Sequence, residues 1–352
     1  MPGPAFARIP RERLPELLRT MPKAELHLHI EGSLEPELLF ELARKNGVSL
    51  AYPTVEALRR AYAFSDLQSF LDIYYAGASV LLEAADFEAM ATAYFRRAHA
   101  DGVLHAELFV DPQTHTARGV PMAAVFEGLT RARAAAEAEL GITSELILCF
   151  LRHLPEEDAS ATLEAALPFR DRFAGVGLDS SERGHPPEKF ARVFARAGEL
   201  GLRRVAHAGE EGPANYVRTA LDVLHVERID HGVRAVDDPD LVARLARERV
   251  PLTVCPLSNT KLRVYGRMED HVLADLLAAG VMATVNSDDP AYFGGYVAAN
   301  YEAVFTALPS LGAAEAYTLA RNSLEASFAS PERRAEMVAR LDRAFADAAV
   351  AA

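Results

Sequence analysis

Eight short β-rich runs alternate with amphipathic helical segments along this chain of 352 residues. Segments between the runs, such as "DPDLVARLARERV", show apolar residues at helical spacing and begin with Asp or Pro. A steady alternation of strand and helix requires crossover connections, and hence a parallel sheet covered by helices. With eight repeats the closed form is a (β/α)8 TIM-type barrel, which is the α/β fold class that we predict. The runs cover residues 24–30, 103–110, 144–151, 173–180, 203–209, 228–233, 251–258 and 281–288.

Two helical stretches depart from this repeat. Residues 35–102, between the first two runs, contain several helical patterns, and we expect this insertion to cap the mouth of the barrel. An Ala-rich tail over residues 312–352 is also helical and should pack outside the barrel as a C-terminal extension. No internal repeat, low-complexity linker or change of composition divides the chain. We therefore expect one domain over residues 1–352, although length alone favours two.

Charge and composition narrow the classes of partner. The formal net charge of −13 would repel phosphate backbones and anionic lipids, so we expect a small molecule rather than a nucleic-acid polymer or a membrane. The first twenty residues are too interrupted by Pro and Arg for a signal peptide, and no stretch reaches the length of a membrane span. We expect a cytoplasmic protein in which Cys149 and Cys255 are buried, reduced thiols. A homo-oligomer stays possible.

Polar residues follow several of the apolar runs, at the ends where barrels carry their functional side chains. His27 and His29 project from the same side of one strand, because successive side chains alternate between faces. The other polar groups are "HAGEEG" at 207–212, "DHG" at 230–232 and "NSDDPAYFGG" at 286–295. A lone His-x-His pair is more often packing, and a lone Asp-Asp pair is usually a turn or a cap. Burial of unpaired His and Asp is costly, however, so four such groups at one barrel end indicate a site.

Three histidines and a carboxylate form a ligand set suited to zinc. We predict one Zn²⁺ per chain, bound by His27, His29, His207 and Asp288 with a position left open for water. The ion would lower the pKa of that water and supply hydroxide at neutral pH. The remaining histidines receive no chemical role. We expect His99, His225 and His271 at the surface, His105 and His153 in the core or at its rim, and His115 and His185 in loops, where ligand contact is less expected.

Five motifs resemble those of the adenosine and adenine deaminases of the metal-dependent amidohydrolase superfamily. The resemblance spans about residues 20–330 in the same order, through "HLHIEGSL", "VAHAGEEGP", "RIDHGV", "CPLSNTKL" and "NSDDPAYF". It implies a hydrolase of purine metabolism with the same four zinc ligands. It further implies that Glu210 is the proton donor to the purine ring, that His231 positions or deprotonates the attacking water, and that Asp289 binds the purine. Dearomatising the ring moves electron density onto a ring nitrogen, so an acid such as Glu210 is required there.

The substrate is predicted from two departures from the nucleoside enzymes. Those enzymes commonly carry Asp at the position of Glu31, where it meets the ribose, and Gly near the position of Ser180. Both residues of this chain are larger, so we expect both in the substrate site and the free base as the substrate. The expected reaction converts adenine to hypoxanthine and ammonia. Adenosine or an N6-substituted, cytokinin-like adenine is the alternative substrate, and an inactive purine-binding protein is the non-enzymatic alternative.

Two other metal-dependent classes lack their signatures. A two-metal amidohydrolase would normally use a carboxylated Lys on the fourth strand, and "FAGVGLDSSE" contains none. A cytidine-type deaminase would show H-x-E together with P-C-x-x-C, and P-C-x-x-C does not occur. A single metal ion is therefore expected.

Overall fold

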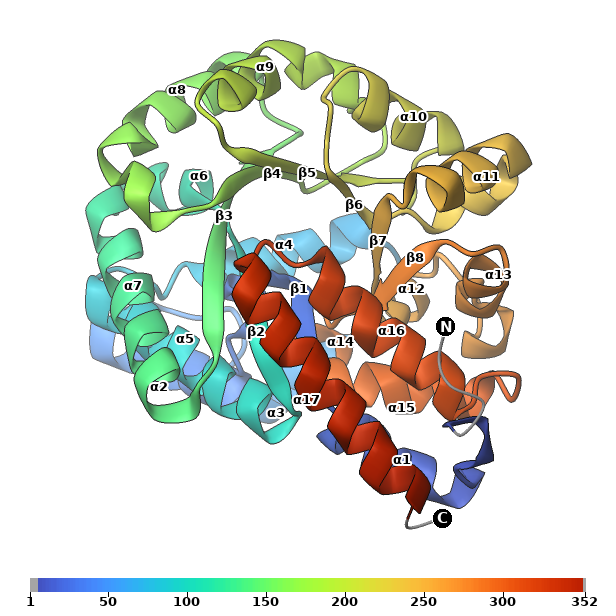
Figure 1. The fold of residues 1–352 in the computed structure, drawn as a ribbon. Coiled ribbons are helices and arrows are strands. Elements are labelled where there is room, and N and C mark those ends of the chain that lie inside the picture. Colours follow the sequence, from blue (N-terminus) through green and yellow to red (C-terminus); the bar gives the residue numbers. More distant parts are fainter. Residues whose placement is uncertain (1–5, 351–352) are drawn as a thin grey trace.

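The computed structural model describes residues 6–350, and its eight parallel strands follow one another around a barrel in the order β1 to β8 (Figure 1). Asp288, after the last strand, closes the barrel against the first strand by two backbone hydrogen bonds. Its N–H donates to the carbonyl of His27 at 3.0 Å, and its carbonyl accepts from the N–H of His29 at 3.0 Å. The predicted (β/α)8 barrel is confirmed. The strands are β1 Lys23–His29, β2 Val103–Val110, β3 Thr143–Leu151, β4 Gly175–Asp179, β5 Arg203–Ala208, β6 Arg228–His231, β7 Pro251–Val254 and β8 Met282–Val285.

The strands are apolar because they are covered on both sides. All seven residues of β1 and all eight of β2 are buried, since one face fills the barrel and the other packs against the helices. Cys149 on β3 and Cys255 after β7 are both buried and form no disulfide, as expected.

Seven helices form the outer wall between successive strands (Figure 1). The helix α11 (Pro239–Glu248) shows how such a helix begins and ends. Asp238 accepts a hydrogen bond from the N–H of Leu241 at 3.1 Å, Pro239 is in the first turn, and Arg249 ends the helix in a left-handed conformation. The seven are α5 Ala84–Ala100, α7 Met122–Leu140, α8 Glu156–Ala166, α9 Ala191–Glu199, α10 Ala214–Asp222, α11 Pro239–Glu248 and α13 Leu273–Ala278. Short helices follow three strands: α6 Pro112–Thr116, α12 Pro256–Lys261 and α14 Pro290–Phe293. Single 3-10 turns cover Phe6–Arg8, Arg11–Arg13, Glu31–Ser33, Leu167–Arg172, Pro187–Phe190, Val233–Asp237 and Met268–Asp270.

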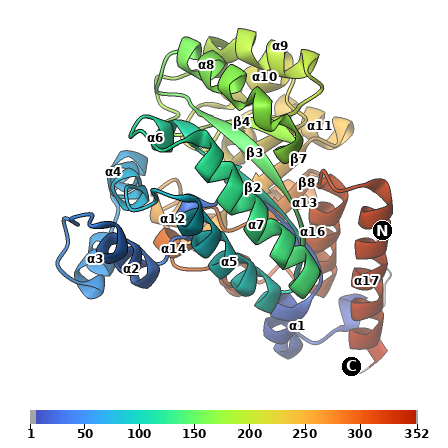
Figure 2. The same cartoon turned by 90° about the vertical axis from the view of Figure 1, so that its left-hand side faces the viewer.

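The segment expected to cap the barrel contains four helices with two different roles. The first three, α2 Pro36–Asn46, α3 Val55–Ala61 and α4 Leu67–Ala78, lie together on one side of the molecule (Figure 2). The fourth, α5, is the crossover from β1 to β2 and packs against α7. Gly128 of α7 allows this contact, because a Cβ atom there would collide with the carbonyl oxygen of Ala84. Only the segment before α5 is therefore an addition to the barrel.

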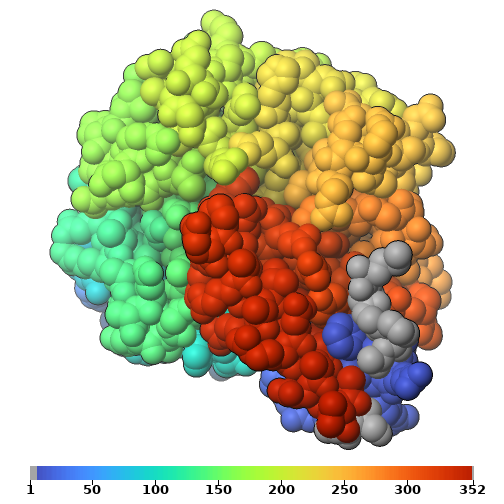
Figure 3. Space-filling model, viewed as in Figure 1, coloured from blue at the N-terminus to red at the C-terminus, as the bar shows by residue number. Residues whose placement is uncertain are grey.

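The C-terminal helices cover the opposite side of the molecule. α16 Ala313–Ala326 packs on β8 and β1, and α17 Pro331–Val350 lies across α16. Phe6 stacks near Tyr317 of α16 with ring centroids 4.8 Å apart, which ties the N-terminal segment to this layer. The two helices form a raised surface in the space-filling view (Figure 3). The remaining helices are α1 Leu14–Thr20 and α15 Val297–Ala307; among residues 6–350, no helix is both long and apolar enough to cross a bilayer.

Candidate metal centre

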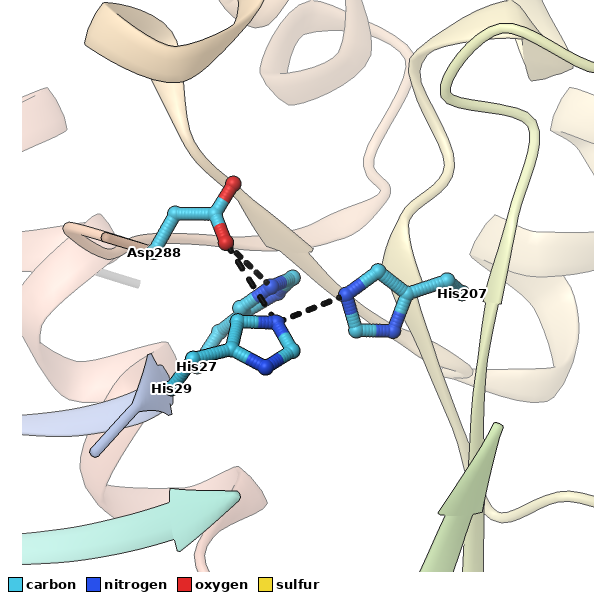
Figure 4. Close-up of side chains that lie close together, drawn as sticks. All are labelled: His27, His29, His207 and Asp288. Carbon is cyan, nitrogen blue, oxygen red and sulfur yellow. Dashed lines mark hydrogen bonds and ion pairs between the residues drawn. The ribbon is translucent and has the colours of Figure 1, made fainter. Parts of the chain in front are cut away.

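The four predicted ligands converge inside the barrel (Figure 4). Their ligand atoms all lie within 4.8 Å of one another. Nε2 of His29 is 3.1 Å from Nε2 of His207, and Oδ1 of Asp288 lies 3.3 Å from Nε2 of His27 and 3.5 Å from Nε2 of His29. The structure thus brings together residues from β1, β5 and the segment after β8.

Backbone geometry explains why these side chains meet. His27 and His29 lie two residues apart on β1 and share its inner face. Asp288 has a φ of +64° and His231, at the end of β6, a φ of +63°. Left-handed backbone is unfavourable for residues other than glycine, and such strain concentrates at functional sites. Here it turns two side chains into the barrel mouth directly after their strands.

A hydrogen bond behind the cluster fixes the orientation of His27, and a carboxylate lies behind His207. The Thr253 hydroxyl donates to Oδ1 of Asp230 at 2.9 Å, so it must accept from Nδ1 of His27, which lies 2.9 Å away. His27 therefore carries its proton on Nδ1 and directs the Nε2 lone pair into the cluster. Oδ2 of Asp230 also lies 3.6 Å from Nδ1 of His207. A carboxylate or hydroxyl behind each imidazole is the usual support of a metal-binding histidine.

The electrostatics of the cluster suit a cation. Burial lowers the pKa of His29 to about 4, and burial together with the neighbouring imidazoles holds the pKa of His207 well below its usual value. Burial opposes ionisation of Asp288, but contacts with His27, His231 and His29 outweigh it and lower the pKa of this carboxyl. Nε2 of His27 is buried without a hydrogen-bond partner. Burial opposes protonation of His27, but the charges of Asp288 and Asp230 outweigh it and raise its pKa. Three imidazoles and a carboxylate around one point are a ligand set that fits a divalent cation such as Zn²⁺.

Glu210 and His231 lie beside this cluster. Oε2 of Glu210 is 3.6 Å from Nε2 of His231, which is also 3.6 Å from Oδ2 of Asp288. Burial, together with the nearby charges of Asp288, Glu182 and Glu211, raises the pKa of Glu210 well above its usual value. These surroundings favour the protonated form of its carboxyl group. A protonated acid next to a cation site can donate a proton to a bound base.

Glu182 holds the loop that carries Glu210, and the sequence analysis did not select it. Its carboxylate accepts four backbone hydrogen bonds, from the N–H groups of Gly209 at 2.7 Å, Glu210 at 3.0 Å, Glu211 at 2.9 Å and Gly212 at 2.7 Å. The only signal was an acidic residue in "DSSE" after the fourth strand, a motif that was used for Ser180 and for its lack of Lys.

Of the three residues expected to bind substrate, two line the pocket and one lies behind its wall. Asp289 and Ser180 line the pocket, and Oδ1 of Asp289 is buried without a partner. The Ser180 hydroxyl lies 2.9 Å from the Tyr75 hydroxyl of α4 and 2.9 Å from Nδ1 of His153. Glu31 lies beneath the pocket wall, where it contacts Nε2 of His115 at 2.7 Å and accepts from the N–H of Asp111 at 3.3 Å. The pocket is lined by His29, Leu67, Phe70, Leu71, Tyr74, Tyr75, Asp111, Asp179, Ser180, His207, Glu210, His231, Leu262, Asp288, Asp289 and Phe293.

Two pocket carboxyls were not foreseen. Asp111 follows β2 and Asp179 ends β4, and three of their four carboxyl oxygens have no hydrogen-bond partner. The fourth, Oδ2 of Asp111, accepts from the Tyr74 hydroxyl at 3.3 Å. Burial raises the pKa of Asp179 to about 7, and burial and neighbouring carboxyls raise that of Asp111 well above its usual value. Oδ2 of Asp179 is also 3.5 Å from Nδ1 of His29, so it supports that ligand.

One histidine was misplaced by the sequence analysis. His271 was expected at the surface, but it is buried and its Nε2 lies 3.2 Å from Oδ1 of Asn259. It lies directly before α13, where the short apolar pattern gave no sign that a neighbouring helix covers it. His99 and His225 are exposed, and His105 is buried on β2, as expected.

Comparisons with known proteins agree with this geometry. The family model described as adenosine deaminase matches residues 22–344. The chain belongs to the adenosine deaminase family. Membership makes it a hydrolase that acts on C–N bonds.

Several relatives match this chain over most of its length. An adenine deaminase from Trichlorobacter lovleyi is 66% identical over 340 residues, which cover 97% of each chain. An adenine deaminase from Cupriavidus necator is 68% identical over 329 residues, which cover 94% of this chain and 93% of the relative. The crystal structure of adenine deaminase from Arthrobacter aurescens is similar to this chain, with 52% identity and a TM-score of 0.90. The match covers 92% of this chain and 99% of the chain in that structure. An amidohydrolase from Burkholderia ambifaria, solved with bound Zn, has 26% identity and a TM-score of 0.88, covering 96% of this chain and 95% of its own.

Proposed function

We propose that this enzyme hydrolyses adenine to hypoxanthine and ammonia with one Zn²⁺ held by His27, His29, His207 and Asp288. The observation that carries the proposal is the convergence of these four ligands in a lined pocket, beside Glu210, whose carboxyl pKa is raised by burial and neighbouring charges. Relatives of 66% and 68% identity that bear the name adenine deaminase support the choice of substrate. The ion would supply a nucleophilic hydroxide from water at neutral pH.

The residues of the chain have complementary tasks in this reaction. Glu210 gives a proton to the ring nitrogen beside the carbon under attack, where negative charge develops. Asp289, whose pKa is raised by burial and by the charge of Asp288, faces the imidazole half of the base as a hydrogen-bond partner. His231 holds the attacking water next to Glu210. The four apolar side chains Leu67, Phe70, Leu71 and Phe293 cover the base and exclude bulk water.

Asp111 and Asp179 favour a free base over a nucleoside. A free purine base carries an N–H group at the ring nitrogen that bears the sugar in a nucleoside. Unpartnered carboxyl oxygens in the pocket wall can accept a hydrogen bond from that N–H. A sugar at the same atom would remove the donor and collide with the buried wall. Glu31, expected to act by its bulk, contributes here from beneath by binding the N–H of Asp111.

A substrate panel tests the proposal. Zinc-loaded protein of measured metal content is supplied with adenine, adenosine, 9-methyladenine and N6-isopentenyladenine, and release of ammonia or alkylamine is followed. We expect adenine to be preferred by at least about a hundred-fold over 9-methyladenine, because a hydrogen-bonding site rejects an analogue that lacks the donor. A preference for adenosine would contradict the free-base assignment. Binding without ammonia release would indicate an inactive purine-binding protein, and alkylamine release at a higher rate would identify an N6-substituted substrate.

A further inference from the structure

His231 is supported from behind by a chain of three hydrogen bonds that ends on a backbone amide. Nδ2 of Asn259, in α12, lies 3.4 Å from Nδ1 of His231. Oδ1 of the same amide lies 3.2 Å from Nε2 of His271. Nδ1 of His271 accepts a hydrogen bond from the N–H of Leu273 at 3.1 Å, in the first turn of α13. The three side chains are buried, with exposed fractions of 1%, 0% and 4% in the order His231, Asn259, His271.

The amide of Leu273 determines the direction of every bond in this chain. A backbone N–H can only donate, so Nδ1 of His271 must be an acceptor. Burial lowers the pKa of His271 to about 4, so the ring is neutral at pH 7 and its single proton is on Nε2. That N–H donates to Oδ1 of Asn259. The NH₂ group of Asn259 then faces His231, whose Nδ1 must accept.

We propose that His271 and Asn259 are positioning residues that fix His231 in the tautomer with its proton on Nε2. Nε2 is the atom that faces the reaction site, 3.6 Å from both Glu210 and Asp288. His231 therefore offers the attacking water a hydrogen-bond donor and has no lone pair with which to deprotonate it. The proposal deepens the proposed function, which leaves open whether this histidine positions or deprotonates water.

The reversed arrangement would bury unsatisfied groups. If His231 carried its proton on Nδ1, the Asn259 amide would have to turn its oxygen toward it and its NH₂ toward His271. Nε2 of His271 would then have to accept, and the proton on Nδ1 would point at the N–H of Leu273. Two donors would face each other without an acceptor, in a buried position that water does not reach. His271 cannot rotate easily to avoid this, because the Tyr265 ring packs 5.0 Å from it.

The tautomer can be measured directly. Two-bond ¹H–¹⁵N correlation spectra of zinc-loaded, ¹⁵N-histidine-labelled protein distinguish protonated from unprotonated ring nitrogens. Signals are assigned by their loss in His231→Gln and His271→Gln. We expect protonated Nε2 and unprotonated Nδ1 for both residues at pH 7. A protonated Nδ1 on His231 would overturn the proposal. Because this spectrum needs no turnover, it separates failure of the tautomer assignment from failure of the proposed reaction, which the ammonia assay reports.

Variants of the two positioning residues test the consequence for catalysis. In Asn259→Asp the new carboxylate only accepts, so it draws a proton onto Nδ1 of His231. We expect kcat for adenine to fall on the order of a hundred-fold with KM nearly unchanged, and the NMR signal of Nδ1 to become that of a protonated nitrogen. Asn322→Asp is the matched control: Asn322 donates to the carbonyl of Ala283 at 2.9 Å, away from the pocket, and its change should leave kcat and the tautomer unaltered.

A pair of variants at His271 distinguishes hydrogen bonding from packing. His271→Gln keeps an N–H donor for Asn259 and should retain kcat within about three-fold, whereas His271→Leu keeps bulk without the donor and should lose at least about ten-fold. This pair decides the matter if Asn259→Asp does not fold. Equal activity of the two His271 variants would overturn the proposal, as would normal turnover of Asn259→Asp with a protonated Nδ1 on His231.

Discussion

We expect Glu210 to act as an acid, because its surroundings favour the protonated form of its carboxyl group. Burial and three neighbouring carboxylates raise the pKa of this carboxyl, and its Oε1 has no protein partner, so the proton is available to a substrate. Glu210→Gln removes the transferable proton and preserves the shape. We expect kcat to fall by about 10²–10⁴-fold, with metal content and melting temperature unchanged. Ammonia release by metal-loaded protein measures the effect. Glu157→Gln, at an exposed carboxylate that pairs with Arg192 at 2.6 Å away from the pocket, is the control, and near-normal turnover of Glu210→Gln would refute the acid role.

Glu182 makes a separate contribution by organising the backbone of the same loop. Oε2 of Glu182 accepts three of the four N–H groups, and Oε1 accepts that of Gly209. A glutamine that keeps its oxygen at the place of Oε2 would turn its NH₂ group, which can only donate, toward the N–H of Gly209. Glu182→Gln should therefore cost about 1–3 kcal/mol of unfolding free energy, since one buried donor loses its partner, and kcat should fall as Glu210 moves. Denaturant unfolding and ammonia release measure the two effects.

A matched control for Glu182 lies outside the site. Glu156 accepts from the backbone N–H groups of Arg192 at 2.6 Å and Val193 at 3.0 Å at the start of α9. Glu156→Gln should reduce stability and leave kcat unchanged. If both variants left kcat unchanged, Glu182 would support the fold alone.

At the scale of elements, the barrel was predictable and the ends of its strands were less so. The eight apolar runs sit where the eight strands lie, because both faces of such strands are buried. The run expected over 251–258 ends early, however, with β7 at Val254 and α12 starting at Pro256. Proline has no N–H for a sheet and suits the first turn of a helix. The expected strand over 281–288 likewise ends at Val285, and Asp288 follows in left-handed backbone.

Site residues were predictable where topology alone placed them. His27, His29, His207 and Asp288 were selected because strand ends of a barrel meet at one rim. Their supports, Thr253, Asp179 and Asp230, were not selected because those contacts depend on strand register and rotamers, which no local pattern reveals. For the same reason His271 was misassigned: its partner Asn259 belongs to another helix, and the contact is tertiary.

A hydroxyl pair is one of the contacts that connect the helix α4 of the added segment to the barrel. Tyr75 of α4 and Ser180 after β4 lie 2.9 Å apart at the pocket edge. Tyr75→Phe should raise KM for adenine about five-fold with kcat nearly unchanged, because one hydrogen bond of about 1 kcal/mol is lost from the closed pocket. Steady-state kinetics measure this effect. The control is Tyr52→Phe, at a tyrosine of the same added segment that lies away from this pocket. A larger effect on KM of Ser180→Ala than of Tyr75→Phe would show that Ser180 also binds substrate directly.

At the scale of the whole molecule, a buried ion pair joins the barrel to its C-terminal extension. Arg228 on β6 bonds to Oε2 of Glu107 on β2 at 2.5 Å and to the carbonyl of Leu26 on β1 at 3.0 Å, so it crosses the barrel interior. The N–H of Phe328, between α16 and α17, donates to Oε1 of Glu107 at 2.5 Å, and the Phe328 ring lies 4.8 Å from the Arg228 guanidinium. The extension thus reaches the interior on the side of the molecule away from α4.

Removing Arg228 leaves the charge of Glu107 buried without its partner. Burial opposes ionisation of Glu107, but Arg228 and His105 outweigh it and lower its pKa, so this carboxyl stabilises the native protein above the pKa of the unfolded chain. Arg228→Met should cost about 3–5 kcal/mol at pH 7, measured by denaturant unfolding. In this variant burial is opposed only by the weaker contacts with His105 and the N–H of Phe328, so we expect the pKa of Glu107 to rise and its penalty to disappear as the pH falls and the carboxyl becomes protonated. The wild type loses stability over the same acid range, so the difference in unfolding free energy between the two proteins should shrink.

The double variant Arg228→Met with Glu107→Leu should recover much of the loss at pH 7, because no unpaired charge remains. A difference between wild type and Arg228→Met that does not depend on pH would mean that lost packing, and not the bare carboxylate, causes the destabilisation.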